Sequence, residues 1–179
     1  MEFTARRILI AGVSGSGKST LAARIAERTG IPHVELDDLH WGPGWQPRPT
    51  FAADVRDLAA RDAWVTEWQY AGARPVLLAR AEAVVWIDLP TRVTMARVIR
   101  RTIRRRIRRE RLWRAGNVEP PILSALVDPD HIVRWAWRTR DKYRTGEEAL
   151  PARLESRPDV TLVRLRTARE VADWLDALG

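Results

Sequence analysis

The feature that most constrains this chain is a glycine-rich turn over residues 12–20, placed between an apolar run and a helix-forming run. Gly12, Gly17, Lys18 and Ser19 match the pattern G-x-x-x-x-G-K-[ST], whose backbone N–H groups surround phosphate oxygens. Glycines are needed there because a Cβ atom would collide with the phosphates. The following helix adds unpaired N–H donors and a partial positive charge. We therefore expect the chain to bind a nucleoside triphosphate.

The residues of this turn have separate expected roles. The Lys18 ammonium can reach the β- and γ-phosphates, and the Ser19 hydroxyl can bind Mg²⁺, so ATP and Mg²⁺ are the expected cofactors. The guanine-selecting motif Asn-Lys-x-Asp does not occur in the sequence, which disfavours a GTPase. The residues predicted to hold the nucleotide are Gly12, Ser14, Gly15, Ser16, Gly17, Lys18, Ser19 and Thr20.

The composition indicates one globular domain that binds anions. The 179 residues suffice for a hydrophobic core, so we predict a single domain over residues 1–179. No run of about 18 apolar residues occurs, and the first predicted strand leaves no room for a signal peptide, so we expect no membrane segment and a cytoplasmic location. The chain has no cysteine, which excludes disulfides and thiolate chemistry. The net charge of +8 suits nucleotides, phosphorylated substrates or nucleic acid.

Strand and helix patterns alternate along the whole chain. Apolar runs predict strands at residues 6–11, 33–36, 63–67, 83–88 and 160–165. Helices are expected at 18–28, from 50, at 76–80, from 91, at about 130–143, after 151, and from 167, where Thr167 and Glu170 can form a capping box. This alternation predicts an α/β fold with a doubly wound, five-stranded parallel sheet.

Carboxylates follow three of the predicted strands, at the edge where such sheets bind ligands. Asp37, Asp38, Glu67 and Asp88 are therefore expected around the triphosphate. Glu67 is predicted to bind Mg²⁺ together with Ser19, directly or through water. Asp37 can act as a base or hydrogen-bond acceptor for a substrate hydroxyl, or lie in the outer shell of the metal. The alternative for each carboxylate is to cap a helix or face water.

A loop after the second predicted strand is the candidate acceptor site. It contains His40, Trp41 and Trp45, and its tryptophans either bind a base or sugar or pack on the domain, because exposed indoles are costly. We expect the acceptor to contact Asp37, His40, Trp41, Trp45, Glu67 and Tyr70.

Residues 97–128 form a lid-like segment rich in arginine. Its apolar positions recur at helical spacing, and its arginines can be a solvated helix face, a phosphate-clamping lid or a contact for nucleic acid. The lid is favoured because the segment follows the fourth strand. Guanidinium groups clamp phosphate with two hydrogen bonds, so Arg101 and Arg105, one turn apart, are the expected catalytic arginines, with Arg138 of a later helix.

These motifs together resemble those of the small P-loop kinases, the adenylate kinase and shikimate kinase group. More closely, the chain resembles bacterial topology modulation proteins, which are often called adenylate-kinase-like ATPases. The resemblance covers nearly the whole chain. It rests on residues 12–20, on Leu36-Asp37 with Leu39-His40-Trp41 and Pro43-Gly44-Trp45, on Trp64-Val65, on residues 85–90 and on Arg134-Trp135…Trp137-Arg138.

The resemblance implies a three-layer P-loop NTPase fold with the strand order 2-3-1-4-5. It also implies a substrate-binding region after the second strand and an arginine-bearing lid after the fourth. One position departs from the family pattern, in which Asp-Gly-Asn-Tyr follows the third strand. Here that stretch is Glu67-Trp68-Gln69-Tyr70, and we expect the bulk of Trp68 to reshape the acceptor pocket.

Two functions follow from these patterns. The leading one is an ATP- and Mg²⁺-dependent phosphotransferase acting on a small acceptor, for which a nucleoside monophosphate is one candidate. The alternative is an ATP-dependent nucleic-acid-binding or regulatory ATPase without a small-molecule acceptor.

Overall fold

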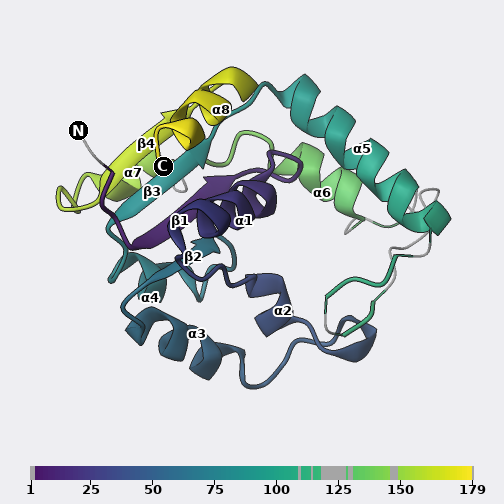
Figure 1. Ribbon diagram of the computed structural model, residues 1–179. Helices are drawn as coiled ribbons and strands as arrows, with labels where there is room; N and C mark the ends of the chain where they lie inside the picture. Colours follow the sequence, from purple (N-terminus) through teal and green to yellow (C-terminus); the bar gives the residue numbers. More distant parts are fainter. Residues whose placement is uncertain are drawn as a thin grey trace.

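A parallel sheet lies at the centre of the computed structural model, which describes residues 3–108, 110–113, 115–117, 128, 131–145 and 149–178. Four strands occur in the described residues, in the order β2-β1-β3-β4 (Figure 1). Ile10 of the central strand β1 pairs with Glu67 on one side and with Val85 on the other. The phosphate-binding turn therefore leaves the middle of the sheet's carboxyl edge. The strands are β1 Arg7–Gly12, β2 Trp64–Glu67, β3 Ala83–Ile87 and β4 Thr161–Leu165.

The predicted strand at residues 33–36 is wrong, and with it the five-stranded sheet and the order 2-3-1-4-5. His33 forms a single parallel bridge with Val65. The Thr66 hydroxyl donates a hydrogen bond to the Val34 carbonyl (2.7 Å). In a continuous parallel strand pair, a backbone N–H of the neighbouring strand would bond to that carbonyl. Leu36 already belongs to helix α2, Leu36–His40. The segment therefore lies beside β2 without becoming a strand.

The other predicted elements are present with small shifts in their ends. Half of the predicted capping box is present, because the Thr167 Oγ1 atom accepts a hydrogen bond from the Glu170 N–H (3.0 Å). The Glu170 carboxylate accepts from the N–H of Arg166, one residue before the cap (2.8 Å). The helix predicted at about 130–143 is shorter, and residues 118–127 of the predicted lid-like segment lie outside the described residues. Among the described residues, no helix combines the length and apolarity needed to cross a membrane. The remaining helices are α1 Lys18–Thr29, the 3₁₀ turn Pro43–Trp45, α3 Phe51–Ala60, α4 Arg74–Leu78, α5 Thr91–Arg108, α6 Ile132–Arg138, α7 Leu150–Leu154 and α8 Ala168–Asp176.

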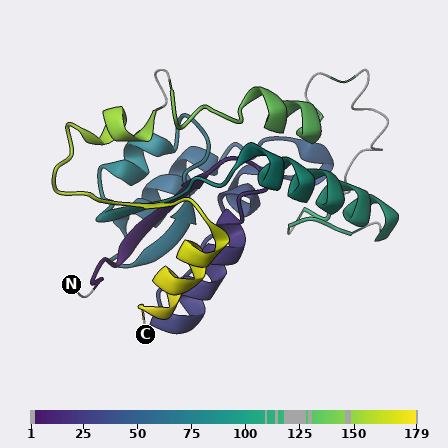
Figure 2. The same cartoon turned by 90° about the horizontal axis from the view of Figure 1, so that it is seen from above.

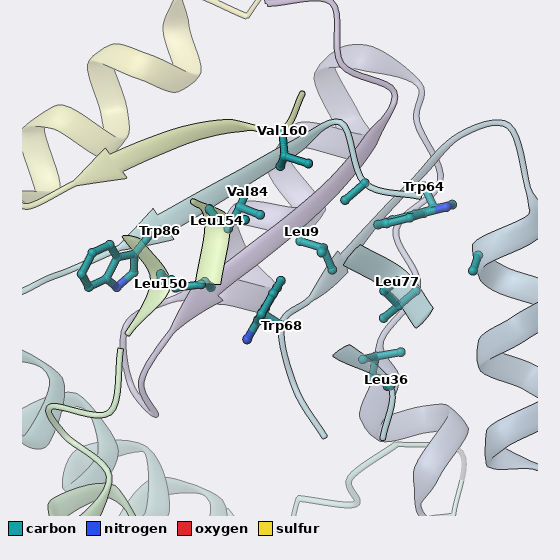
Figure 3. Packing of buried hydrophobic residues seen from close by; sticks show 14 of the residues in the cluster. Leu9, Leu36, Trp64, Trp68, Leu77, Val84, Trp86, Leu150, Leu154 and Val160 are labelled. Atoms are coloured by element: carbon teal, nitrogen blue, oxygen red, sulfur yellow. The ribbon is translucent and has the colours of Figure 1, made fainter. Parts of the chain in front are cut away.

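Alternating side chains of β1 point into two separate cores, which gives the fold three layers. Ile8 and Ile10 pack with residues of α1 and α8 on one face of the sheet (Figure 2). Leu9 and Ala11 face the other core, which contains residues of α2, α3, α4 and α7 and three buried tryptophans (Figure 3). Both faces of the sheet are thus covered, as the continuous apolar runs of its strands require.

Several large apolar side chains of α5 and α6 are exposed to solvent, although an amphipathic helix usually buries its apolar face. Of the apolar positions of α5, Val98 is buried, but Ile103 and Ile107 are 41% and 75% exposed. Helix α5 runs past the end of the sheet, so the far part of its apolar face has no sheet to cover it (Figure 1). Trp135 of α6 is 44% exposed, while its neighbour Ala136 is buried.

Candidate functional site

The phosphate-binding turn is packed against α5 as well as against the sheet. Gly15 has φ +77°, and a Cβ atom there would lie 2.3 Å from the Thr94 carbonyl oxygen of α5. Arg97 of α5 donates a hydrogen bond from Nη1 to the Ser16 carbonyl (3.2 Å). The motif itself does not specify a glycine at position 15. The need for it comes from α5, some 80 residues further along the chain.

The turn presents N–H groups that are not used inside the described part of the chain. Ser16 donates to the Val13 carbonyl (3.1 Å), whereas the N–H groups of Ser14, Gly15 and Gly17 donate to no other described atom. The Lys18 ammonium lies over the same turn, with Nζ 3.3 Å from the Val13 carbonyl oxygen. The nucleotide-holding roles of these residues stay predictions.

Lys18 also faces the carboxylates that follow β2 and begin α2. Burial lowers the pKa of its ammonium, while the charges of Glu67 and Asp37 act in the opposite direction. Arg101 adds to the lowering, and the net pKa stays below the usual value. The lysine of the turn, two carboxylates and one arginine of α5 therefore lie within electrostatic reach of one another.

Glu67 ends β2 in a buried position, at 2% exposure. Burial acts to raise the pKa of its carboxyl group, but the neighbouring His33 and Ser19 side chains and the charge of Lys18 together outweigh burial, so the pKa is lowered. The His33 Nε2 atom lies 3.6 Å from Glu67 Oε1. The two residues predicted to bind Mg²⁺, Ser19 and Glu67, are thus brought together, and His33 is a neighbour that sequence reasoning missed.

Asp37 lies in the first turn of α2 and is held by a tyrosine. The Tyr70 hydroxyl donates to Asp37 Oδ1 at 2.5 Å. Burial raises the pKa of Asp37, the Tyr70 hydrogen bond lowers it, Glu67 raises it, and Lys18 and Arg101 lower it, with a raised pKa as the result. Asp37 and Tyr70, both predicted acceptor residues, are therefore directly bonded.

The aromatic loop after α2 is partly covered by the lid-like segment. Trp41 and Trp45 make an edge contact, with ring centroids 5.6 Å apart, and Trp45 makes another with Trp113 at 5.4 Å. Asn117 accepts from the Trp45 N–H (3.3 Å) and donates to the Gly42 carbonyl (3.1 Å). Sequence reasoning missed Trp113 and Asn117, because no local pattern links positions about 70 residues apart.

His40 belongs to the same aromatic group. Its ring lies 4.0 Å from that of Tyr70 and 4.7 Å from that of Phe51, and burial lowers its pKa. Trp68, expected to reshape the acceptor pocket, is instead in the core at 1% exposure (Figure 3). Its carbonyl accepts a hydrogen bond from the Tyr143 hydroxyl (3.0 Å).

The predicted catalytic arginines differ in what they contact. The charge of Arg101 lowers the pKa values of both Lys18 and Asp37. Arg101 therefore lies near the predicted nucleotide-holding turn, here called the donor side, and near the predicted acceptor residues, here called the acceptor side. Arg105 Nε lies 3.8 Å from Glu110 Oε2, within the lid-like segment itself. The Arg138 guanidinium lies 5.9 Å from the ring centroid of Trp135 on its own helix. The catalytic roles of Arg105 and Arg138 stay predictions.

Asp88, the carboxylate after β3, has a different environment from Asp37 and Glu67. It forms ion pairs with Arg144 (2.7 Å) and with Arg164 of β4 (2.5 Å). The Arg164 guanidinium also lies 4.2 Å from the ring centroid of Trp86. Asp88 therefore joins β3, β4 and the segment after α6, a structural role that the sequence left open.

The fold of this chain, a parallel sheet with a glycine-rich turn after β1, is shared by solved structures of kinases. A gluconokinase from Sinorhizobium meliloti 1021 is 23% identical, with a TM-score of 0.52, over 99% of this chain and 93% of that chain. A shikimate kinase from Acinetobacter baumannii, solved with shikimate, is 18% identical, with a TM-score of 0.55, over 97% and 90%. No known family model and no curated protein matches the chain. At these identities the likeness shows the fold, and the closer resemblance to topology modulation proteins stays a prediction.

Proposed function

We propose that this protein is a kinase that transfers the γ-phosphoryl group of ATP, with Mg²⁺, to a hydroxyl group of a small acceptor. One observation carries the proposal. Lys18 of the phosphate-binding turn, Asp37 of α2 and Arg101 of α5 come from three distant segments, and the pKa values of Lys18 and Asp37 respond to each other's charge and to that of Arg101. Phosphoryl transfer needs a donor cradle, an acceptor-side carboxylate and a cation for the transferring group, and these residues supply one of each.

The donor side fits a triphosphate with its metal. The unused N–H groups of Ser14, Gly15 and Gly17 can bind phosphate oxygens, and Lys18 can bind the β- and γ-phosphates. The Ser19 hydroxyl and the Glu67 carboxylate are oxygen donors of the kind Mg²⁺ prefers. When bound, the metal neutralises charge between the phosphates. Ser19 and Glu67 would hold this metal, and Lys18 and Arg101 would bind oxygens of the phosphoryl group that is transferred.

The acceptor side fits a compound with a free hydroxyl group. The raised pKa of Asp37, caused first by burial, makes its carboxylate a better proton acceptor than an exposed one. His40, Trp41 and Trp45 give apolar ring surface on which a sugar or base can lie. Sugar acids and cyclic hydroxy acids are the hydroxyl acceptors to test, and shikimate, which is bound in the shikimate kinase structure, belongs to the second class. Nucleoside monophosphates, the candidate from the sequence, belong in the panel as acceptors that react through a phosphate oxygen and need no base.

The test is phosphoryl transfer from radiolabelled ATP with Mg²⁺ to a panel of these acceptors. We expect one class to be labelled, and Lys18→Ala to lower kcat/KM by about 10³-fold, because a cation on the transferring phosphate is lost. Lys142→Ala is the matched control. Lys142 is the only other lysine, and its ammonium lies over the Tyr143 ring at 4.6 Å. Absence of transfer to every acceptor, with unchanged ATP affinity in Lys18→Ala, would contradict the proposal.

A second candidate, nucleic-acid binding, is favoured by one surface. Helix α5 carries eight arginines and no acidic residue, and Trp135 and Trp137 of the neighbouring α6 are exposed. Cationic side chains with exposed aromatic rings are typical of surfaces that bind single strands. Binding of a labelled oligonucleotide that weakens steeply with salt supports this function. Negligible binding at low salt removes it.

A further inference from the structure

Tyr70 lies in a conformation that an aromatic residue rarely adopts. Its φ of +53° is in the left-handed region, which costs an L-residue with a Cβ atom about 1 kcal/mol. Its carbonyl accepts the N–H groups of Ala73 (3.0 Å) and Arg74 (3.2 Å) at the start of α4. Strained conformations of this kind persist where the surroundings fix them, and they concentrate at functional sites.

The ring of Tyr70 is fixed as firmly as its backbone. The His40 ring lies beside it at 4.0 Å, tilted by 31°, and Phe51 contacts it edge-on at 5.1 Å. The hydroxyl at the end of this held ring donates to Asp37 Oδ1. The loop after β2 and helix α2 are thereby joined at the acceptor-side carboxylate.

We infer that Tyr70 is a positioning residue. It occupies Oδ1 of Asp37 and so leaves Oδ2 as the oxygen that accepts the proton of the acceptor hydroxyl. This inference rests on the proposed function and changes the role of Tyr70, which the sequence predicted to bind substrate. A base held in one orientation accepts a proton more efficiently, because its oxygen is already positioned toward the acceptor hydroxyl.

The charges around the pair agree with this role. Asp37 is faced by Glu67 from β2, Lys18 from α1 and Arg101 from α5, and Glu35 and Asp38 flank it in sequence. Burial and the Asp37 charge both raise the pKa of Tyr70, so the phenol keeps its proton and acts as a donor. The Tyr70 hydrogen bond offsets part of the effect of burial on Asp37 and favours the charged form that a base needs.

The test is Tyr70→Phe, which keeps the ring and removes only the hydroxyl. Carboxyl ¹³C NMR of the full chain, without ligand, should show the pKa of Asp37 raised by about 1, the effect of losing a hydrogen bond to a charged group. In the transfer assay, kcat for the acceptor found in the panel should fall about 10- to 100-fold with KM for ATP unchanged. Tyr143→Phe is the matched control, because it removes the hydroxyl of the only other tyrosine, which bonds Trp68 in the core.

The two readouts separate this inference from the proposed function. An unchanged Asp37 pKa in Tyr70→Phe overturns the positioning role, whatever the activity. An equal fall of kcat in Tyr70→Phe and Tyr143→Phe also overturns it, since both would then act through general stability. If the wild-type chain transfers phosphate to no acceptor, the proposed function fails, and the NMR shift still decides whether Tyr70 holds Asp37.

Discussion

The donor and acceptor sides of the site both use left-handed backbone, but they place it on opposite kinds of residue. On the donor side Gly12, Gly15 and Gly17 have positive φ, at little cost. Among the described residues other than glycine, positive φ occurs only at the aromatic residues Trp45, Tyr70 and Trp113, all on the acceptor side or in the lid-like segment. The donor side is thus built from permissive backbone, and the acceptor side from strained backbone that ring contacts hold in place.

This difference reflects how each side is assembled. The donor cradle is one short turn that follows β1 and enters α1. The acceptor side joins α2 and the loop that follows it with three residues from distant segments, through side-chain contacts of Tyr70, Trp113 and Asn117. A substitution in the donor turn should therefore weaken both folding stability and nucleotide binding. Substitutions on the acceptor side should have smaller effects, each limited to the contact that is removed.

The largest effect is expected from Gly15→Ala. The added Cβ would lie 2.3 Å from a backbone carbonyl of α5, and the residue would keep a positive φ. We expect a loss of about 3 kcal/mol in the free energy of unfolding and a loss of ATP binding, because α5 must move away from the turn. Urea denaturation and calorimetric titration with a non-hydrolysable ATP analogue measure the two effects.

Gly44→Ala provides the control for backbone strain alone. Gly44 has φ +66°, but a Cβ there meets nothing within 4 Å, so we expect a loss of only about 1 kcal/mol. Equal effects of the two substitutions would show that the close contact with α5 does not matter, and the assembly described above would be wrong.

Arg101→Ala should have the next largest effect. Arg101 is the arginine of the lid-like segment that influences both Lys18 and Asp37, so its loss should lower kcat about 10²-fold. Arg104→Ala is the control, because Arg104 lies on the same helix and pairs with Glu110 at 3.4 Å. Comparable losses in both variants would mean that the net charge of α5, and not one guanidinium, acts on the site.

The sequence predicts the donor side better than the acceptor side, because the donor side is one local segment and the acceptor side joins segments far apart in the chain. Residues 12–20 and their flanking strand and helix follow from a local motif, and Ser19 and Glu67 were placed together because carboxyl ends of parallel strands share an edge. The prediction of a strand at 33–36 was wrong, because the spacing of apolar residues does not distinguish a single β-bridge from the continuous pairing of a strand. Likewise, the exposure of Trp135 depends on how far α6 extends from the sheet, which no local pattern contains.

A smaller effect is expected from Asn117→Ala, which tests the contact between the lid-like segment and the aromatic loop. Asn117 is 6% exposed and bonds Trp45 and Gly42, so its loss should cost about 1–2 kcal/mol in the free energy of unfolding. Acceptor KM should rise while KM for ATP does not. Gln46→Ala, at an exposed position beside Trp45, should change neither KM, and a rise in KM for ATP in Asn117→Ala would contradict the separation of the two sides.

The smallest effects concern the two carboxylates, and their signs should be opposite. The pKa of Asp37 is raised above its ordinary value of 3.8 by burial, so folding stability falls as the pH rises from that value through the folded-state pKa. Asp37→Asn lacks this titration, and it should be more stable than the wild type at pH 7, although the proposed function predicts that it transfers no phosphate. The difference should disappear below the ordinary pKa, where both chains carry an uncharged group.

Glu67 should behave in the reverse way, because the nearby His33, Ser19 and Lys18 side chains lower its pKa below the ordinary value of 4.5 despite burial. Its charged form stabilises the fold above that value, and the stabilisation is lost as the pH falls through the folded-state pKa. Glu67→Gln should therefore be less stable than the wild type at pH 7, and the gap should narrow in acid. Thermal melts of Asp37→Asn and Glu67→Gln between pH 3 and 8 measure these stability differences. If both substitutions change stability at pH 7 in the same direction, Asp37 and Glu67 do not differ in the way that their pKa shifts indicate.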